Sequence, residues 1–243
     1  MKWFFKLLAL TRFFSSWNIK NKYGWIGSLI YPLCFYVILT VVGGTEMSSH
    51  AIVGALIALL WRSGVGILPQ HILRFNFIKL KEMFVAAPIH PLMYMLGASI
   101  SVLIASLPPM VPFIVLLIAY VNVTFIELFY LMLVLLAAWL MSSALGFVVA
   151  GYIKDPTKIG TIAPWTSALL TTLPPVYYPL AALPRQYRVV ALIVPTTHLA
   201  EAAKISVKIT IPSFNPLIHG VSIFVYMMLF LFLAGFKSRW REK

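Results

Sequence analysis

Long blocks of apolar residues, separated by short polar stretches, constrain this chain more than any other feature. Two of the blocks, at about 92–120 and 125–153, each exceed the roughly 20 apolar residues that cross about 30 Å of hydrocarbon. Hydrophobic residues make up 61% of the chain and charged residues 10%, against about 45–50% and about 25% in soluble proteins. The pattern predicts an all-α integral membrane protein, built as one transmembrane domain over residues 1–243.

Six candidate transmembrane helices can be placed on these blocks. The third is long for one crossing and contains Pro108, Pro109 and Pro112. The predicted spans cover about 26–44, 51–72, 92–120, 125–153, a stretch that starts near Ile162, and 217–236. An even number of crossings places both ends of the chain on the same side of the membrane.

The first 25 residues predict a helix that lies in the membrane interface. Apolar side chains recur on one stripe at helical spacing, and basic residues lie beside it. The stripe consists of Trp3, Leu7, Leu10, Phe14 and Trp17, flanked by Lys2, Lys6 and Lys20. A cleaved signal peptide is the alternative, but its apolar core "LLAL" is short and Arg12 interrupts it. We expect the helix over residues 1–25 to be retained.

Basic residues are concentrated in one alternate set of loops, and the net charge is +13. Lys and Arg number five in residues 1–25, three at 74–81, two at 154–158 and four in the tail from 237, whereas the other set of loops holds four. Because cytoplasmic loops carry such an excess, both termini are predicted to be cytoplasmic, with the chain in the cell (plasma) membrane. This charge then faces anionic lipid headgroups and indicates no nucleic-acid partner.

Several helix boundaries carry capping residues. Thr124 and Glu127 fit a capping box at the start of the fourth span. Asp155 followed by Pro156 predicts an N-cap and a first-turn proline ahead of the fifth span. Within the fourth span, small residues recur every four positions, at Ala138, Ser142, Gly146 and Ala150. Such a face lets helices approach closely, either inside one subunit, which we favour, or between two copies.

Motifs for catalysis are missing. The chain has no G-x-x-x-x-G-K-[ST] phosphate loop and no H-E-x-x-H, and its five histidines lack metal-ligand spacing. All six carboxylates fall in loops or at span ends, whereas ion-driven carriers usually keep acids inside their spans. The single cysteine, Cys34, excludes a disulfide framework. We expect no catalytic residue, and no metal or cofactor held by this chain.

Arg62 is the one charged residue predicted near the middle of a span, where its insertion costs about 2.5–3.5 kcal/mol. It either lines a polar path and touches substrate, or it snorkels or bonds to a carbonyl of a neighbouring span. The sequence favours neither alternative. Arg62 therefore enters the candidate translocation path with its role open.

The segment at 74–88, "RFNFIKLKEMFVAAP", is too charged to cross the membrane and too apolar for a free loop. Phe77, Leu80 and Phe84 share one helical face, and Glu82 lies away from it. Prolines at 88 and 91 end the helix. The pattern predicts a short amphipathic helix on the cytoplasmic side, which is either membrane-associated or docked in a groove of a partner protein.

The stretch "LPPVYYPLAALP" at 173–184 places four prolines in an otherwise apolar run. Each proline inside a helix costs about 3 kcal/mol. Irregular backbone at membrane depth is tolerated only where it is buried in protein or lines an aqueous cavity. We therefore predict that the fifth span ends here and that residues 174–212 form a re-entrant segment on the outer side. Residues 174–183 are either part of an outer gate or simply the end of the helix.

The order of these segments resembles the membrane permease of ABC-2 type transporters, a family of exporter subunits. In that family the fifth span commonly ends in "pPl..lP", followed by "NP.ty..ea.r". Here "YPLAALP" at 178–184 matches the first motif and "VPTTHLAEAAK" at 194–204 matches the second. Val194 stands where the family often has Asn, and His198 where an aromatic residue is common. The resemblance covers nearly the whole chain.

The resemblance implies that the 74–88 helix is a coupling helix against a separate ATPase subunit, with residues 3–17 as a connecting helix at the same interface. The implied coupling residues are Phe77, Leu80, Lys81, Glu82 and Phe84, with Lys81 and Glu82 as the polar contacts. ATP and Mg²⁺ would be bound by the ATPase. Two permeases, as a homodimer or close heterodimer, would pair with two ATPases. The family's "ExG" pattern is not kept, since Met83 and Phe84 follow Glu82.

The resemblance also implies export by alternating access between the two faces of the membrane. The candidate gate and path residues are Arg62, Pro174, Pro175, Tyr178 and Pro179. Two other interpretations stay open on the residues alone. One is a secondary carrier or channel that uses no nucleotide. The other is a membrane enzyme for lipid-linked substrates, in which Arg62 and the outer arginines contact a phosphate.

Overall fold

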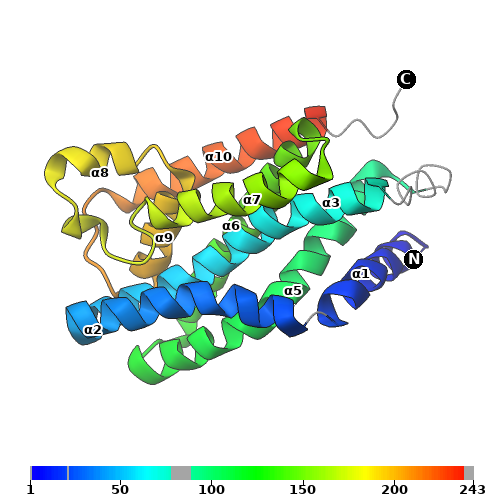
Figure 1. Cartoon of the computed structure of the whole chain (residues 1–243). Coiled ribbons are helices and arrows are strands. Elements are labelled where there is room, and N and C mark those ends of the chain that lie inside the picture. Colours follow the sequence, from blue (N-terminus) through cyan, green and yellow to red (C-terminus); the bar gives the residue numbers. More distant parts are fainter. Residues whose placement is uncertain (1, 21, 78–88, 238–243) are drawn as a thin grey trace.

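The computed structural model describes residues 2–20, 22–77 and 89–237, and every regular element in these ranges is a helix. The helices are α1 (Lys2–Lys20), α2 (Lys22–Trp61), the π-helix η1 (Arg62–Ile67), α3 (Leu68–Phe77), α5 (Pro91–Tyr120), α6 (Phe125–Tyr152), α7 (Pro156–Thr172), the 3₁₀-helix η2 (Leu180–Ala182), α8 (Arg185–Ala191), α9 (Pro195–Ser206) and α10 (Pro216–Lys237). Figure 1 shows them as an elongated bundle. The predicted all-α class is confirmed.

Helix α2 consists of two halves that fold back on each other at Gly44. Gly44 has φ 66° and ψ −160°, a backbone conformation that glycine adopts without a Cβ clash. Residues 24–28 of the first half and 59–71 of the returning helix line one pocket, so the two halves lie side by side. The chain leaves the second half through η1 and α3 (Figure 1). This bend lies where the sequence predicts the boundary between the first two spans.

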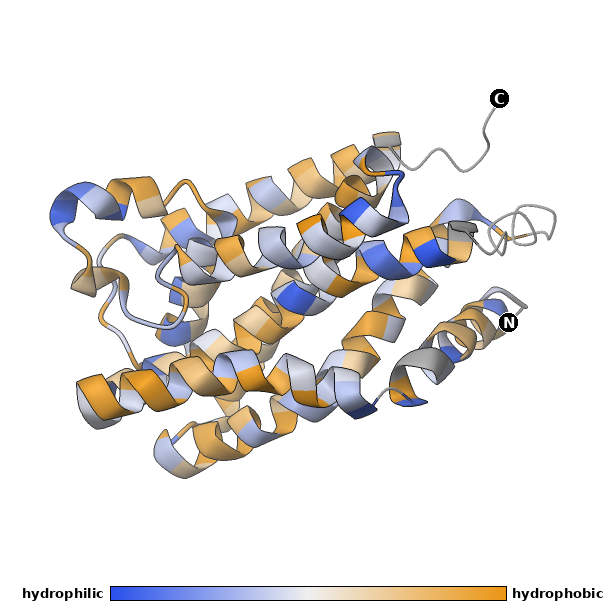
Figure 2. Ribbon diagram, in the orientation of Figure 1, coloured by the Kyte–Doolittle hydropathy of each residue, from blue (hydrophilic) through white to orange (hydrophobic). Residues whose placement is uncertain are grey.

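The second half of α2 is the centre of the bundle. Residues 51–61 are almost completely buried, because α5, α6 and α9 pack around them. Apolar side chains of the outer helices are exposed instead, as at Val41, Phe125 and Phe232. Figure 2 shows that strongly hydrophobic residues dominate the middle of the long helices. Such an apolar exterior is what a helix bundle presents to lipid.

Helices α6 and η1 are in very close contact through small residues. A Cβ added to Gly146 would lie 2.1 Å from the carbonyl oxygen of Gly64, so no larger residue fits there. Ser142 donates a hydrogen bond to the carbonyl oxygen of Leu60 at 3.2 Å. The small-residue face of α6 therefore packs inside the subunit, which confirms the alternative that the sequence favoured.

Helix α1 packs one side against α5 and leaves the other open. Leu10 and Phe14 are buried, and the Phe14 ring lies 5.6 Å from the ring of Tyr94 on α5. On the other side of α1 large apolar residues are exposed, namely Trp3, Phe4, Phe5, Leu8 and Phe13. An apolar side that no described residue covers fits the predicted position in the membrane interface. The helix ends at Lys20, five residues before the predicted boundary.

Four helical stretches are long and apolar enough to cross a membrane, or five if α8 and α9 together form one broken span. The four are Lys22–Phe75, which contains the Gly44 bend, Pro91–Tyr120, Phe125–Tyr152 and Pro216–Phe236. The chain bends by 106° between helices α8 and α9. The chain is therefore a multi-pass helical membrane protein.

The helix that contains the predicted fifth span, α7, begins at Pro156, directly after the predicted N-cap Asp155, and it has 17 residues. Asp155 caps this start, because its carboxylate accepts hydrogen bonds from the backbone N–H groups of Thr157 and Lys158, at 2.8 and 3.4 Å. The predicted capping role of Asp155 is confirmed. The capping box of Thr124 and Glu127 is also present at the start of α6.

The start of α1 and the end of α10 lie at the same end of the bundle (Figure 1). The end of α3 and the turn between α6 and α7 lie at that end too, whereas the bend at Gly44 and helix α8 lie at the opposite end. Of the segments that the sequence identified as rich in Lys and Arg, the described parts at the start of α1, at the end of α3 and at 154–158 therefore share one end. Arg185 and Arg188, which the sequence placed on the other side, are on α8.

Candidate functional site

The proline-rich loop, residues 173–184, follows directly after α7. Its first residue, Leu173, still donates a helical hydrogen bond to the carbonyl of Leu169, at 3.2 Å. Pro174 and Pro175 then end the helix, because neither has an N–H group to continue the pattern. The backbone stays irregular up to Pro179 and forms only the short helix η2 beyond it. The predicted end of the helix at these prolines is confirmed.

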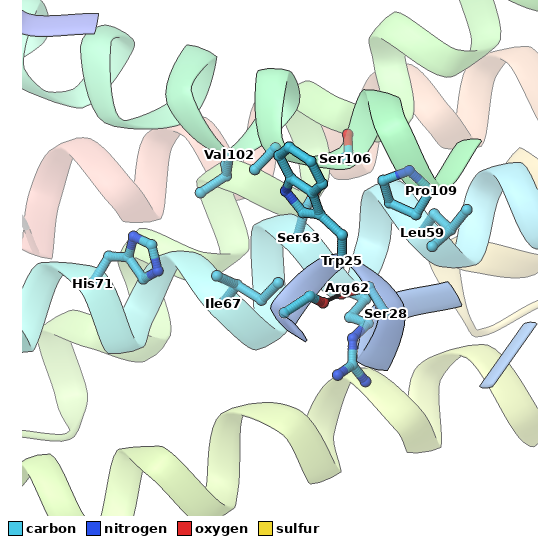
Figure 3. A pocket seen from close by; sticks show the side chains of 12 residues that line it. Trp25, Ser28, Leu59, Arg62, Ser63, Ile67, His71, Val102, Ser106 and Pro109 are labelled. Carbon is cyan, nitrogen blue, oxygen red and sulfur yellow. Dashed lines mark hydrogen bonds between the residues drawn. The ribbon is translucent and has the colours of Figure 1, made fainter. Parts of the chain in front are cut away.

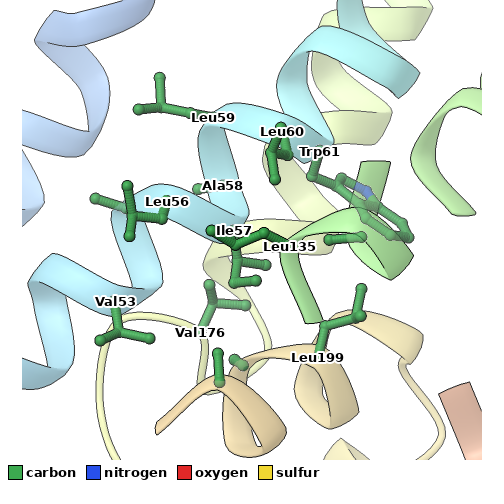
Figure 4. Packing of buried hydrophobic residues seen from close by; sticks show 14 of the residues in the cluster. Val53, Leu56, Ile57, Ala58, Leu59, Leu60, Trp61, Leu135, Val176 and Leu199 are labelled. Carbon is green, nitrogen blue, oxygen red and sulfur yellow. The ribbon is translucent and has the colours of Figure 1, made fainter. Parts of the chain in front are cut away.

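The proline-rich loop passes through the interior of the protein. Val176, Tyr177 and Leu180 are buried almost completely. In Figure 4, Val176 lies between the second half of α2, represented by Val53 and Ile57, and Leu199 on α9. Irregular backbone that is enclosed by protein satisfies the condition for such backbone in a membrane.

Gly54 on α2 makes this close approach possible. A Cβ at position 54 would lie 2.4 Å from the carbonyl oxygen of Val176 and 2.8 Å from the Cα of Tyr177. Both neighbours are backbone atoms, which cannot rotate away as the end of a side chain can. Position 54 therefore has to be glycine for the loop to lie where it does.

Lys204 and Glu201 of α9 hold the loop through its backbone, and we name this pair the Lys204–Glu201 latch. The Lys204 ammonium donates to the carbonyl oxygens of Pro175 at 2.8 Å and Tyr178 at 2.6 Å, and to Glu201 Oε1 at 3.2 Å. Glu201 Oε1 also accepts from the N–H of Leu180 at 3.3 Å. Lys204 has three donors, and all three are used. The side chains are 0% and 1% exposed, so this is a buried and compensated ion pair.

The latch brings together the two sequence motifs that carry the family resemblance. Tyr178 and Leu180 belong to the first motif, whereas Glu201 and Lys204 occupy the acidic and basic positions of the second. Sequence reasoning counted Lys204 among the outer basic residues and missed its role. The available signal was an acid and a base three residues apart, which face the same side of a helix.

Further hydrogen bonds fix the two ends of the proline-rich loop. Arg188 of α8 donates to the carbonyl oxygens of Leu183 at 2.8 Å and Ala181 at 2.6 Å. Thr196 of α9 donates to the carbonyl oxygen of Leu170 on α7 at 2.5 Å. Helices α8 and α9 thus hold both α7 and the loop in place. If the loop moves, these hydrogen bonds have to break, or α8 and α9 have to move together with it.

Arg62 lies deeper in the bundle, at the start of η1, and is partly buried. Its Nε atom is buried and has no hydrogen-bond partner within the described ranges. Its stem lines a cavity of about 60 Å³ together with Trp25, Ser28 and Ser106. Figure 3 shows the guanidinium directed away from Ser106. A Cβ at Gly66 would lie 3.7 Å from both Arg62 Cγ and Ser167 Oγ, so α7 lies beside this stem.

Two tyrosines are the electrostatic neighbours of Arg62. The phenol groups of Tyr31, on the first half of α2, and Tyr177, in the proline-rich loop, lie within electrostatic range of the guanidinium. The Tyr177 ring stacks on Phe35 with centroids 4.6 Å apart and planes 13° apart. Its hydroxyl is buried and has no hydrogen-bond partner among the described residues. Arg62 thus lies within electrostatic range of the loop at Tyr177, and no hydrogen bond joins it to the loop in the described structure.

The structure places the predicted site residues in two groups. Pro174, Pro175, Tyr178 and Pro179 lie together in the loop, and Arg62 lies near their neighbour Tyr177. Of the predicted coupling residues, Leu80, Lys81, Glu82 and Phe84 lie outside the described residues. Residues 74–77, predicted as the start of a separate helix, instead continue α3, which ends at Phe77.

The fold and the latched loop define a multi-pass helical membrane protein whose two motif segments pack on each other. A family model described as "ABC-2 type transporter" matches residues 5–208, which include the Gly44 bend, the proline-rich loop and the Lys204–Glu201 latch. The chain belongs to the ABC-2 type transporter family and is a membrane permease of that family. A search of curated proteins found no match.

Proposed function

We propose that this chain is the permease subunit of an ATP-driven exporter, which moves its substrate by alternating access. The family match carries this proposal, since ABC-2 permeases are membrane subunits of ABC transporters. Hydrolysis of ATP takes place on a separate subunit, which binds ATP and Mg²⁺. The permease itself performs no catalysis.

The proposed topology has six crossings with both termini in the cytoplasm of a cell whose plasma membrane holds the protein. The two halves of the bent first stretch, α5, α6, α7 and α10 provide the crossings. With 17 residues, α7 is about 26 Å long, close to the hydrocarbon thickness. The bent pair of α8 and α9 is then the outer re-entrant segment. The excess of Lys and Arg in the segments predicted to be cytoplasmic supports this orientation.

The ATPase is proposed to act on the segment at 74–88, with Phe77, Leu80 and Phe84 as its apolar contacts and Lys81 and Glu82 as its polar ones. Helix α3 supports this role, because it joins the segment at 74–88 to the central helix without a break in the described backbone. A force on this segment would therefore reach η1 and Arg62 directly. The connecting helix at residues 3–17 lies beside α5 and completes the proposed interface.

The proline-rich loop is proposed to form the outer gate, and Arg62 to line the path that the gate closes. Burial of Val176 and Tyr177 supports this role, since a plain helix end leading into an interfacial loop would leave them exposed. Two copies of the permease are proposed to pair, as a homodimer or close heterodimer. The substrate would pass between or beside them.

Co-purification with the ATPase tests the coupling proposal. The double variant Lys81→Ala/Glu82→Ala should lose the ATPase subunit from the purified complex while the permease stays folded. Lys208→Ala, which removes an exposed basic residue that pairs with Glu127 of α6, is the matched control and should keep the subunit. The coupling proposal fails if both variants retain the ATPase equally.

Labelling of single cysteines tests the orientation. In a Cys34→Ala background, Ser213→Cys should react with an impermeant maleimide on intact cells. Lys79→Cys should react only after the membrane is permeabilised. The reverse pattern would place the termini outside and overturn the proposed topology.

A further inference from the structure

Arg62 has no acidic partner within the described part of the chain. Glu127 pairs with Lys208 at 2.7 Å, and Glu201 pairs with Lys204. Glu46 lies on the same helical stretch but 16 residues before Arg62, about 24 Å along the axis. The remaining described carboxylate, Asp155, caps α7. The cation at Arg62 is therefore not compensated by these residues.

This arrangement is unfavourable unless something else supplies negative charge. A cation in the middle of a membrane helix costs about 2.5–3.5 kcal/mol. Burial of the Arg62 Nε without an acceptor adds the cost of an unmade hydrogen bond. The same protein compensates Lys204 completely, so its fold is able to provide partners for a buried cation. An anion from outside the chain would compensate Arg62 in the same way.

The groups around Arg62 are suited to an oxyanion. A guanidinium presents a planar fork of N–H donors that matches the oxygens of phosphate or carboxylate. The hydroxyl of Tyr177 adds an O–H donor that is buried and unpartnered in the described structure. Stacking on Phe35 fixes the direction of this ring. The guanidinium of Arg62 and the hydroxyl of Tyr177, from two separate segments, thus each keep a buried donor without a partner, and no described carboxylate pairs with either.

The surroundings of this donor group are apolar. The cavity beside the Arg62 stem is lined largely by carbon, including Leu59, Ile67, Val102 and Pro109. Its volume of about 60 Å³ holds a few water molecules, far below the roughly 300–1,000 Å³ of a pocket for a drug-sized ligand. The guanidinium is directed away from this cavity, so a head group bound to it lies outside the cavity and the rest of the ligand extends along the apolar helices.

We infer that the Arg62 site binds the oxyanion head of an anionic amphiphile, and that such molecules are the class of substrate that this permease moves. The inference rests on the proposed transport function. Arg62 holds the phosphate or carboxylate through its guanidinium fork, and Tyr177 donates its hydroxyl to the same group. Binding of the head group also contacts the proline-rich loop through Tyr177, which connects recognition of the substrate to the proposed gate.

Direct binding of dodecyl phosphate to the full chain in a neutral maltoside detergent tests the site. Calorimetry should show binding by the wild type that weakens at least tenfold in Arg62→Gln and less in Arg62→Lys, which keeps the charge but not the fork. Tyr177→Phe removes only the hydroxyl and keeps the stacking, and it should weaken binding about threefold or more. Arg185→Gln removes one positive charge from α8 and should bind like the wild type.

Two further probes separate the head group from the whole amphiphile. Inorganic phosphate should bind at least a hundredfold more weakly than dodecyl phosphate, and the affinity for dodecyltrimethylammonium should not fall in Arg62→Gln. Equal affinity of the wild type and Arg62→Gln for dodecyl phosphate would overturn the site. Tight binding of inorganic phosphate would assign it to a free anion instead of an amphiphile.

Stimulation of ATP hydrolysis in the complete transporter tests whether the ligand is a substrate. Dodecyl phosphate should raise hydrolysis by the wild-type complex and by Arg185→Gln. In Arg62→Gln the ratio of stimulated to unstimulated hydrolysis should fall to about one. Equal stimulation in Arg62→Gln would overturn the substrate class and leave the exporter function intact. Absence of any ATPase partner would refute the exporter function, whereas the binding measurement on the isolated chain would remain valid.

Discussion

Lys204 and Arg62 are two basic residues inside the same apolar body, and their surroundings are opposite. Lys204 is fully buried, and its ammonium binds one carboxylate and two backbone carbonyls. Arg62 is partly buried, and its Nε atom has no hydrogen-bond partner among the described residues. All three donors of the Lys204 ammonium thus have acceptors, whereas the Nε donor of Arg62 has none in the described structure.

This difference separates a structural cation from one that is available to a ligand. A buried ion pair that is fully hydrogen-bonded has no capacity left for another partner, and its removal damages the fold. A cation without a partner contributes little to the fold and keeps its donors free. Substitutions at the two positions should therefore differ in kind, with a large loss of stability at Lys204 and a loss of binding without a loss of stability at Arg62.

Lys204→Met should give the largest loss of stability. It leaves Glu201 buried without its partner and removes the donor from the carbonyls of Pro175 and Tyr178. Breaking a buried ion pair on one side costs about 3–5 kcal/mol. Thermal unfolding of the detergent-purified protein should show a strongly lowered midpoint, or no folded protein should be recovered.

Lys208→Met is the matched control for that change. Lys208 also binds a glutamate, Glu127, but its side chain is 79% exposed, so an effect below about 1 kcal/mol is expected. The double variant Lys204→Met/Glu201→Met should recover part of the lost stability, since it removes the uncompensated charge. If Lys204→Met and Lys208→Met unfold at the same temperature, the latch has no structural role.

Gly54→Ala should give the next largest effect. The new Cβ would meet the carbonyl oxygen of Val176 at 2.4 Å, so the loop or the helix has to move. Overpacking of this kind costs about 1–3 kcal/mol. Gly160→Ala on α7 is a suitable control, because a Cβ there has no atom within 4 Å. Similar melting temperatures for the two variants would mean that the loop is not held against α2.

The features that the sequence could predict are those with local causes. The capping box at Thr124 and Glu127, the N-cap at Asp155 and the end of α7 at Pro174 each depend on residues a few positions apart. The helical class of the fold follows in the same way, since the apolar blocks alone require it. The sequence also predicted that the small-residue face of α6 makes a close helix contact. It left open whether this contact lies inside the subunit or between two copies, and the structure shows the first.

The features that the sequence could not predict depend on contacts between distant segments. Lys204 binds carbonyls 26 and 29 residues away, and a count of charges in loops treats it as a surface residue. The unpartnered hydroxyl of Tyr177 results from the path of the loop, which no local pattern describes.

Pro174→Ala/Pro175→Ala should have a smaller effect on stability and a large one on transport. The alanines restore the N–H groups that allow α7 to continue. A continued helix would turn the carbonyl of residue 175 toward its own backbone and away from Lys204, which now binds it at 2.8 Å. We expect a loss of about 1–2 kcal/mol, from one buried hydrogen bond and from the more flexible unfolded chain.

Transport of a fluorescent amphiphile into vesicles, with assembly checked by co-purification of the ATPase, measures that effect. Pro216→Ala, which changes the first residue of α10 at an exposed position, is the control and should transport normally. Unchanged transport by the Pro174→Ala/Pro175→Ala variant would mean that the loop is only the end of a helix and no gate. Loss of assembly would also count against a gate, because it would make the prolines structural.

Arg62→Met should give the smallest change in stability and so completes the contrast with Lys204. The substitution removes an uncompensated charge and a buried donor without an acceptor, and it keeps an unbranched side chain along the cavity. We expect the free energy of unfolding to stay within about 1 kcal/mol of the wild type, or to rise, because the cost of the buried charge disappears. Thermal unfolding in a neutral detergent, without added anionic lipid, is the appropriate measurement.

The same measurement with dodecyl phosphate should raise the unfolding midpoint of the wild type and not that of Arg62→Met, since only a folded protein with Arg62 is stabilised by binding. A loss of several kcal/mol in Arg62→Met without the ligand would mean that the chain itself compensates this arginine, and the distinction between the two cations would not hold.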